Sequence, residues 1–323
     1  MRGQDVTVQG AGRAAPTPGG TVAFLGPEGT FTSEAADLAA PGRTRLALPT
    51  IPDVVDAVRE RRADIGVVPI ENSIEGGVNL TSDALVFGPT GAFLSAELTL
   101  PIEMALLTAP GARLEDIREV RSMPVALAQS RRRLAETLPG VAVSATPSTA
   151  EAASQVAQGD GSLAALGPPR AAVRYGLAVG LPDLADHPGN TTRFVVLGPR
   201  MAAPTGADKT SLVVFFGQDR PGLLLRVLEE FALRGINLVK IESRPTKQSL
   251  GEYCILVDCE GHPADARVGE ALRSVHRHVA EVRVLGAYPR ADLRPVVPAR
   301  ADTDTAYADA VGWYAGLLRD VQP

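Results

Sequence analysis

Short apolar segments alternate with longer amphipathic segments over residues 21–197 of this 323-residue chain. The clearest apolar segment runs from Ala63 to Pro69, and the polar residues Glu71 to Ser73 follow it directly. A strand that is apolar throughout is typical of a sheet covered by helices on both faces, and regular strand–helix alternation indicates a doubly wound α/β fold. We expect two such lobes, joined by extended segments within residues 93–107. The cleft between the lobes is then the default ligand site.

The second lobe contains a helix that starts at a proline. Pro124 suits the first turn of a helix because its φ angle is already fixed near the helical value. The pattern that follows predicts one continuous helix from Pro124 to Leu138, with Gln129 on it.

A different pattern follows residues 201–209, whose Ala, Pro, Gly and Thr content is typical of a linker. Residues 210–288 predict the order strand, helix, strand, strand, helix, strand, which indicates a ferredoxin-like α+β module with its helices on one face. Beyond it, residues 289–323 form a tail in which Thr305 to Leu318 predict a short amphipathic helix, with Trp313 as a packing residue. The remaining parts of the chain are a disordered leader over residues 1–20 and the two-lobed domain over residues 21–200.

Composition excludes several classes of protein. A formal net charge of −5 gives no basic footprint for nucleic acid and no electrostatic case for a membrane surface, and no apolar run reaches the ~18 residues of a transmembrane helix. The leader lacks the apolar core of a signal peptide. Cys254 and Cys259 fit no metal or redox motif and indicate reduced, packed thiols. We expect a cytoplasmic protein without metal or cofactor.

Polar residues recur where predicted strands begin or end. Asn190 to Phe194 form a polar segment that leads into an apolar strand, and they belong with Glu71 to Ser73 if both groups face the cleft. Adjacent hydroxyl and guanidinium groups there could donate to, and clamp, an anionic substrate. Taken alone, Asn190 to Phe194 are better explained as a surface loop. For Glu71 to Ser73, a turn before a helix is as good an explanation as a ligand site.

Several segments in the right order resemble bacterial prephenate dehydratases with a C-terminal ACT regulatory domain. The resemblance spans about residues 21–287, and several ordered motifs are more specific than any one of them. The segments that carry it are Val22 to Phe31, Val68 to Gly76, Ala126 to Gln129, Asn190 to Phe194, Pro221 to Leu224 and Ile241 to Pro245. It implies a periplasmic-binding-protein-like catalytic domain that converts prephenate to phenylpyruvate, water and carbon dioxide.

The resemblance also implies roles for single residues. Thr192 would assist departure of the ring C4 hydroxyl, Arg193 would hold a substrate carboxylate, and Phe194 would position the loop. The residues implied in substrate binding are Thr30, Glu71, Asn72, Ser73, Gln129 and Asn190. Threonine is a poor acid at neutral pH, so Asp186 or His187 is considered as the proton source, although solvation of a loop explains both residues better.

The chain departs from the family pattern at three places. Met123 stands where the family often has a histidine, which removes a titratable group and leaves a core-filling side chain. Ser130 stands where a cysteine is common. At the start of the ACT helix, Leu223 replaces a smaller residue next to the expected effector pocket, and this could change effector selectivity.

By resemblance, ACT modules pair side by side and bind an amino acid at the shared interface. L-phenylalanine is the expected effector, and the chain is expected to form a homodimer or homotetramer. The residues implied in effector binding are Gly222, Leu223, Leu224, Asn237, Glu242, Ser243 and Arg244.

Three other functions stay open at this point. The same scaffold could act on arogenate, or it could decarboxylate prephenate without forming an aromatic ring. A third possibility is a non-catalytic, two-lobed binding protein that senses an amino acid. The intact Thr192-Arg193-Phe194 segment favours dehydration over the second of these, and the absence of a signal peptide argues against a transport receptor of the third kind.

Overall fold

The computed structural model describes residues 19–217, 220–319 and 321. Most of the predicted leader, up to residue 18, lies outside the described residues. The chain divides into two compact units. The N-terminal unit contains residues 13–88 and 98–197, and the C-terminal unit contains residues 89–97 and 198–323.

The first lobe of the N-terminal unit is built on a sheet with the strand order β11-β3-β1-β2. Its strands are β1 (Thr21–Leu25), β2 (Thr44–Leu48), β3 (Ile65–Asn72) and β11 (Thr191–Gly198), and the two-residue β4 (Gly76–Gly77) pairs with the end of β3. Its helices are α1 (Phe31–Ala39), α2 (Ile51–Arg59) and α3 (Asn79–Phe87). Strand β1 is parallel to both neighbours, whereas β11 is antiparallel to β3. The central residues of β1 are fully buried because helices pack on the sheet.

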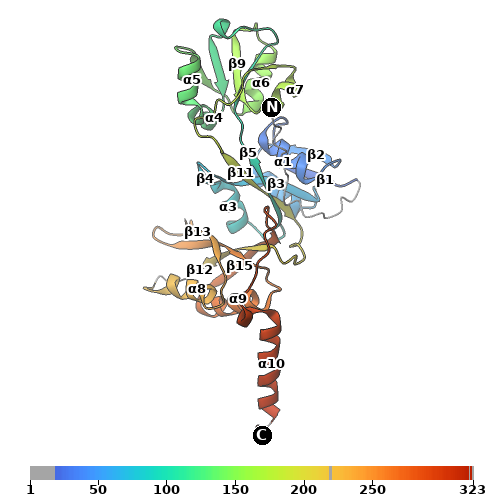
Figure 1. Ribbon diagram of the computed structural model, residues 1–323, viewed down its shortest axis with the longest axis vertical. Helices are drawn as coiled ribbons and strands as arrows, with labels where there is room; N and C mark the ends of the chain where they lie inside the picture. Colours follow the sequence, from blue (N-terminus) through green and yellow to red (C-terminus); the bar gives the residue numbers. More distant parts are fainter. Residues whose placement is uncertain (1–18, 218–219, 320, 322–323) are drawn as a thin grey trace. The chain divides into compact units, whose positions relative to one another are not determined.

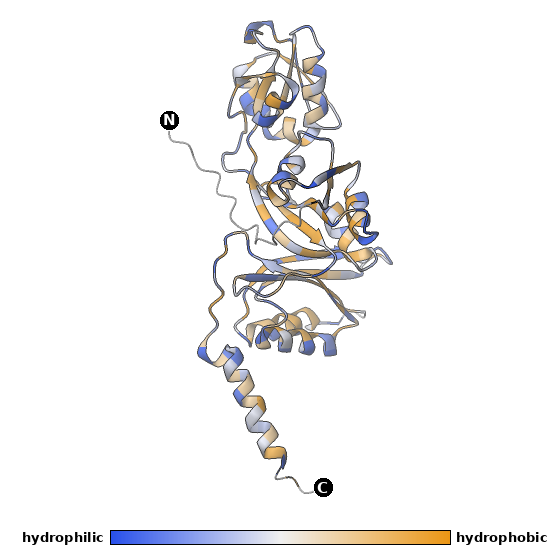
Figure 2. Ribbon diagram, turned by 90° about the vertical axis from the view of Figure 1, so that its right-hand side faces the viewer, coloured by the Kyte–Doolittle hydropathy of each residue, from blue (hydrophilic) through white to orange (hydrophobic). Residues whose placement is uncertain are grey.

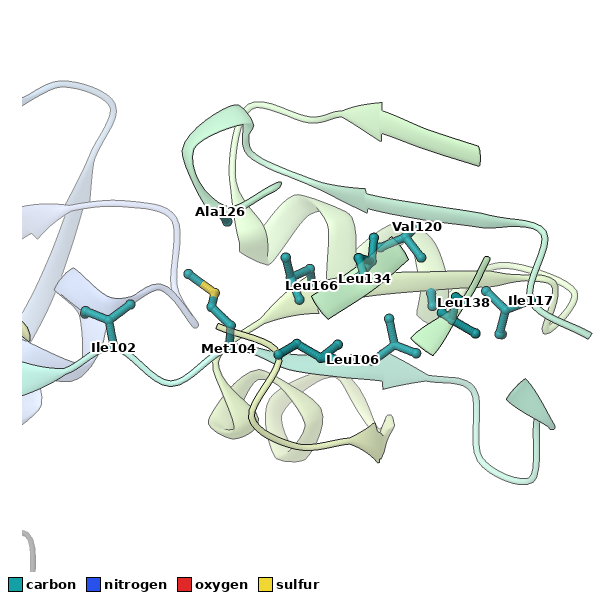
Figure 3. Close-up of a cluster of buried hydrophobic side chains, with 11 residues drawn as sticks. Ile102, Met104, Leu106, Ile117, Val120, Ala126, Leu134, Leu138 and Leu166 are labelled. Atoms are coloured by element: carbon teal, nitrogen blue, oxygen red, sulfur yellow. The ribbon is translucent and has the colours of Figure 1, made fainter. Parts of the chain in front are cut away.

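The second lobe has a five-stranded sheet with the order β10-β6-β9-β7-β8. Its elements are β6 (Ala105–Thr108), η1 (Leu114–Asp116), β7 (Glu119–Ser122), α4 (Pro124–Gln129), α5 (Arg131–Thr137), β8 (Ala142–Ala145), α6 (Thr149–Ala157), β9 (Leu163–Gly167), α7 (Pro169–Tyr175) and β10 (Ala178–Leu181). Figure 1 shows α4 and α5 on one side of β9 and α6 and α7 on the other. Leu106 and Leu166 pack with Leu134 in one buried cluster (Figure 3), whereas Ala105 and Leu107 pack on the opposite face. The doubly wound architecture is therefore confirmed.

The predicted continuous helix from Pro124 to Leu138 is wrong at one point. It breaks at Ser130, whose φ and ψ of −124° and 8° are not helical, so that α4 and α5 are separate. The carboxylate of Asp186 explains the second start, because it accepts hydrogen bonds from the backbone N–H groups of Arg132 (3.0 Å) and Arg133 (2.9 Å). The break leaves Gln129 as the last residue of α4, in a buried position.

The C-terminal unit has the predicted ferredoxin-like order. Its elements are β12 (Asp208–Phe215), α8 (Leu223–Ala232), β13 (Leu238–Pro245), β14 (Tyr253–Glu260), α9 (Ala266–His278) and β15 (Glu281–Pro289), with strand order β13-β14-β12-β15. Leu212 and Val214 of β12 pack against Val227 and Phe231 of α8 in the core of this unit. Leu94 of β5 (Phe93–Pro101) pairs with Gly286 of β15.

The predicted tail helix is present as α10 (Asp304–Arg319), which follows the short helix η2 (Arg300–Asp302). Figure 2 shows hydrophobic and hydrophilic residues interspersed along it. Trp313 is 71% exposed, so the prediction that it packs is wrong: α10 extends from the unit with none of its residues buried. Within the described ranges, no helix is long and apolar enough to cross a membrane.

An ion pair links α1 to the sheet of the first lobe. The guanidinium of Arg45 binds the Glu28 carboxylate through two bonds of 2.8 and 2.7 Å, contacts Asp37 and lies 4.4 Å from the centre of the Phe24 ring. Both partners are about a quarter exposed, with 24% and 29% of their side chains accessible. The hydrogen bond from Arg45 holds the pKa of Glu28 below its ordinary value.

This pair predicts a pH-dependent stability. A carboxylate whose pKa is lower in the folded state contributes stability above its unfolded pKa and loses it as the pH falls through the folded value. We expect Arg45→Met to lower the melting temperature at pH 7, and the difference from wild type to shrink at about pH 3. Thermal unfolding followed by circular dichroism measures both.

Arg62→Met is the matched control, since Arg62 and Glu60 form a pair with 49% and 58% of their side chains exposed. Such exposed pairs contribute little, so this variant should unfold like wild type at both pH values. A destabilisation by Arg45→Met that is the same at both pH values contradicts the assignment.

Candidate active site

The pairing of β11 with β3 brings the two predicted polar groups together. In this antiparallel ladder Thr192 lies opposite Asn72 and Arg193 lies opposite Glu71. The backbone N–H of Ser73 donates to the carbonyl of Thr191 (2.9 Å), which continues the pairing past the end of β3. Two segments more than a hundred residues apart in sequence thus form one polar surface.

The Asn72 side chain has a defined amide orientation. Its Oδ1 accepts the backbone N–H groups of Ile74 and Glu75, both at 3.0 Å. Because two N–H donors require an oxygen acceptor, the Nδ2 group must point the other way. There it donates to Thr192 Oγ1 (2.9 Å) and to Asn190 Oδ1 (2.8 Å).

This bond decides what the Thr192 hydroxyl can do. Thr192 is 8% exposed, and its oxygen already accepts from Asn72. A hydroxyl has one hydrogen to donate, and that hydrogen cannot point at Asn72 Nδ2, which is itself a donor. The Thr192 proton is therefore directed away from Asn72 and is available to another oxygen.

Asn190 and Gln129 extend the same chain of amides from the first lobe to the second. Asn190 is 4% exposed and donates through Nδ2 to Gln129 Oε1 (3.0 Å). Its backbone carbonyl accepts from Ile102, at the crossing between the lobes (2.7 Å). Asn72, Asn190, Gln129 and Thr192 thus form one hydrogen-bonded network.

Arg193 and Phe194 have opposite environments on the same strand. Arg193 Nε lies 3.2 Å from Glu71 Oε2, with 12% of the arginine side chain exposed. The register shifts between Arg193 and Phe194, and Phe194 is 1% exposed in the core. Phe194 anchors the strand by packing, whereas Arg193 forms an ion pair with Glu71.

Ser73 and Thr30 contribute differently from the amide chain. Ser73 is exposed, and its Oγ accepts from the backbone N–H of Thr191 (2.9 Å) and lies 3.4 Å from Asn190 Oδ1. Thr30 caps α1: its Oγ1 accepts from Ser33 N (3.2 Å) and donates to the carbonyl of Pro27 (3.0 Å). It lines a separate hollow of about 400 Å³ together with Arg170 and other residues of α1 and α7.

The candidate proton source Asp186 does not fit that role. Partial burial raises its pKa, but the hydrogen bonds from the Arg132 and Arg133 backbone outweigh this and hold the pKa below its ordinary value. Asp186 is therefore an ionised helix cap. Met123 packs against the hydrophobic cluster of the second lobe, so it fills the core at the position of the family's histidine.

The predicted effector residues fall into two groups in the C-terminal unit. Gly222 to Leu224 start α8 and line a hollow of about 470 Å³ with Phe216, Pro221 and Leu228. Gly222 has a φ of +83°, which favours glycine. Glu242, Ser243 and Arg244 lie on β13, at the edge of the sheet, and Asn237 precedes that strand. Glu242 binds Lys240 (3.0 Å) and Arg244 (2.8 Å), and these bonds outweigh the effect of burial and lower its pKa.

Comparison with known proteins decides the family. A family model described as prephenate dehydratase matches residues 22–202, and one described as ACT domain matches residues 210–277. The chain belongs to the prephenate dehydratase family. Its reaction is the conversion of prephenate to phenylpyruvate, water and carbon dioxide, so the chain is a lyase of phenylalanine biosynthesis.

Individual relatives cover nearly the whole chain. A prephenate dehydratase of Mycobacterium leprae (strain Br4923) is 43% identical over 281 residues, 83% of this chain and 86% of the relative. That of Amycolatopsis methanolica is 41% identical over 307 residues, 93% of this chain and 99% of the relative. The crystal structure of a prephenate dehydratase from Arthrobacter aurescens in complex with L-Phe is 40% identical, has a TM-score of 0.85 and covers 93% of this chain and 99% of that one.

Sequence reasoning did not single out Glu75 in this prephenate dehydratase. Its carboxylate accepts a hydrogen bond from Gln129 Nε2 (3.0 Å), so it lies at the end of the amide chain. The available signals were its position three residues after Asn72 and its place in the Val68 to Gly76 segment, and neither carries information about a partner in the other lobe.

The amide orientation predicts the effect of an isosteric change. Asn72→Asp keeps the acceptor for the Ile74 and Glu75 N–H groups and removes both donor bonds, to Thr192 and to Asn190. We expect kcat to fall about a hundredfold, as for loss of one preorganised donor, with a melting temperature close to wild type. Steady-state formation of phenylpyruvate measures the change.

Asn79→Asp is the matched control, because Asn79 is an exposed residue at the start of α3, where an acidic side chain is favourable. It should leave kcat unchanged. Wild-type turnover in Asn72→Asp would show that the Asn72 donor has no part in catalysis.

Proposed function

We propose that Thr192 donates the hydrogen bond that helps the ring C4 hydroxyl of prephenate to leave. The observation that supports this most is the bond from Asn72 Nδ2 to Thr192 Oγ1, which leaves the threonine hydrogen directed elsewhere. A hydrogen bond fixed before the reaction stabilises charge as it develops on the leaving oxygen.

The reaction breaks two bonds of prephenate and needs no oxidant or reductant. The bond between the ring and its carboxylate breaks, and its electron pair enters the ring as carbon dioxide leaves. The C4–O bond breaks at the same time, and the departing oxygen takes up one proton to form water. The ring becomes aromatic, so the reaction is intrinsically downhill. Thr192 supports the departing oxygen, and the proton comes ultimately from solvent.

Substrate charge matches the residues around Thr192. Prephenate carries two carboxylates, and Arg193 is the cation that follows Thr192 in sequence on β11. We assign Arg193 to a substrate carboxylate, which then shares it with Glu71. Asn72, Asn190 and Gln129 hold the polar wall of the site, so that the substrate is oriented before reaction. Ser73 and Thr30 stay predicted substrate contacts.

The assignment of Thr192 is tested by two substitutions. Thr192→Val removes the hydroxyl at nearly constant volume, whereas Thr192→Ser keeps it. We expect kcat to fall at least about a hundredfold for the first and to stay within about tenfold of wild type for the second. Phenylpyruvate absorbance in alkali after incubation with prephenate measures both.

Equal turnover of Thr192→Val and wild type would remove Thr192 from the mechanism. The same assay with arogenate, followed as phenylalanine formation, distinguishes the two substrates. Ring-retaining decarboxylation would appear as carbon dioxide release without phenylpyruvate.

We also propose that L-phenylalanine binds the ACT domain and inhibits the enzyme. The hollow at Gly222 to Leu224 is mainly apolar in its lining, as a phenyl group requires, and the related Arthrobacter aurescens protein was crystallised with L-Phe. Strand β13 is an edge strand with exposed apolar residues such as Val239 and Ile241. We propose that this edge forms the subunit interface of a homodimer or homotetramer. In that assembly, β13 of a second copy would place its residues 242–244 near the effector.

Effector binding is tested at the first residue of α8. Leu223→Arg places a long, charged side chain in the hollow, so the concentration of phenylalanine that halves activity should rise at least about tenfold. Leu233→Arg is the matched control, because Leu233 follows the end of α8 and is 78% exposed. It should leave inhibition unchanged. Equal inhibition of both variants would place the effector elsewhere.

A cytoplasmic location fits the chemistry of the cysteines. Cys254 and Cys259 are free and buried, and burial raises the pKa of Cys259 to about 12. Thiols of this kind are unreactive and consistent with a reducing compartment.

A further inference from the structure

We propose that Glu75 is a positioning residue for dehydration, which acts on Thr192 through Gln129 and Asn190. The inference rests on the proposed role of Thr192. Glu75 lies in the turn between β3 and β4, and its carboxylate is exposed. It contacts the amides of Asn72 and Gln129, which are the two ends of the hydrogen-bonded row Asn72, Asn190 and Gln129.

The first contact is made by the backbone of Glu75. Its N–H donates to Asn72 Oδ1 (3.0 Å) and so helps to turn the Asn72 amide nitrogen towards Thr192. The second contact is made by the side chain. Its Oε1 accepts from Gln129 Nε2 (3.0 Å), on the last residue of α4 in the second lobe. The Glu75 turn therefore contacts the first and the last amide of the chain.

The side-chain contact fixes the direction of every bond in between. An ionised carboxylate only accepts hydrogen bonds, so Gln129 must present its nitrogen to Glu75 and its oxygen to Asn190. Asn190 then presents its nitrogen to Gln129 and its oxygen to Asn72 (2.8 Å). Asn72 in turn donates to Thr192. Glu75 at one end of this row of amides and the backbone N–H groups at Asn72 at the other end require the same direction of hydrogen bonding. If any amide in the row rotated, two donors or two acceptors would face each other.

The contact also joins the two lobes of the N-terminal unit. Without the Glu75 acceptor, Gln129 keeps a single polar partner in the network, and α4 loses its side-chain bond to the β3–β4 turn. Asn190 and Asn72 then have a less firmly held neighbour. We therefore expect the Thr192 hydroxyl to be less well placed. Because this hydroxyl acts when the C4–O bond breaks, kcat should fall more than KM changes.

A double-mutant cycle tests this dependence in the full-length enzyme. We expect Glu75→Ala to lower kcat roughly tenfold with KM within about twofold. Glu75→Gln retains an oxygen acceptor for Gln129 and should keep kcat within about threefold of wild type. In a Gln129→Ala background, Glu75→Ala should lower kcat no further. Glu115→Ala is the matched control, since this glutamate is exposed in the second lobe (68%) and should leave kcat unchanged.

Several results would overturn the proposal. Wild-type kcat in Glu75→Ala, or an equal loss in Glu75→Ala and Glu75→Gln, would show that the acceptor bond has no effect. An equal additional loss in the Gln129→Ala background would show that Glu75 acts by another route. A lower melting temperature with unchanged kcat would leave only a structural role. Absence of phenylpyruvate with wild-type enzyme would instead refute the proposed function itself.

Discussion

The hydrogen bond from the Asn72 amide to the Thr192 hydroxyl is the interaction on which the active site depends. It makes the Thr192 oxygen an acceptor and so directs the Thr192 hydrogen away from Asn72. The bond requires that the Asn72 oxygen be held elsewhere, and two backbone N–H groups of the following turn hold it. The polarity of this hydrogen-bond network therefore originates in the backbone of one tight turn.

The fold supplies the conditions for that bond. Strand β3 is buried between helices, and β11 returns from the second lobe to pair with it in an antiparallel register that sets Thr192 opposite Asn72. Phe194 fixes this register because its buried ring would be exposed by a one-residue slip. Asn190 and Gln129 then extend the network into the second lobe. Packing of apolar side chains thus sets the geometry of the polar ones.

Much of this was predictable from sequence because the relevant patterns are local. The apolar strands, the ferredoxin-like order and the polar residues at Asn72 and Thr192 follow from residues close together in the chain, and the family resemblance orders them. The break at Ser130 was not predictable, since it depends on the Asp186 carboxylate, more than fifty residues away. The partner of Glu75 was hidden for the same reason, because only the folded chain brings Gln129 to it. Trp313 was misassigned because an amphipathic pattern says which face is apolar and not whether anything covers it.

The central claim is the direction of the hydrogen bond between Asn72 and Thr192, and neutron diffraction from deuterium-exchanged crystals observes it directly. The account predicts deuterium on Asn72 Nδ2 along the line to Thr192 Oγ1, with the threonine deuterium pointing away from Asn72. An Asn72 oxygen facing Thr192, with the threonine deuterium directed at it, would contradict the account, because the hydroxyl would then have no hydrogen left for the substrate.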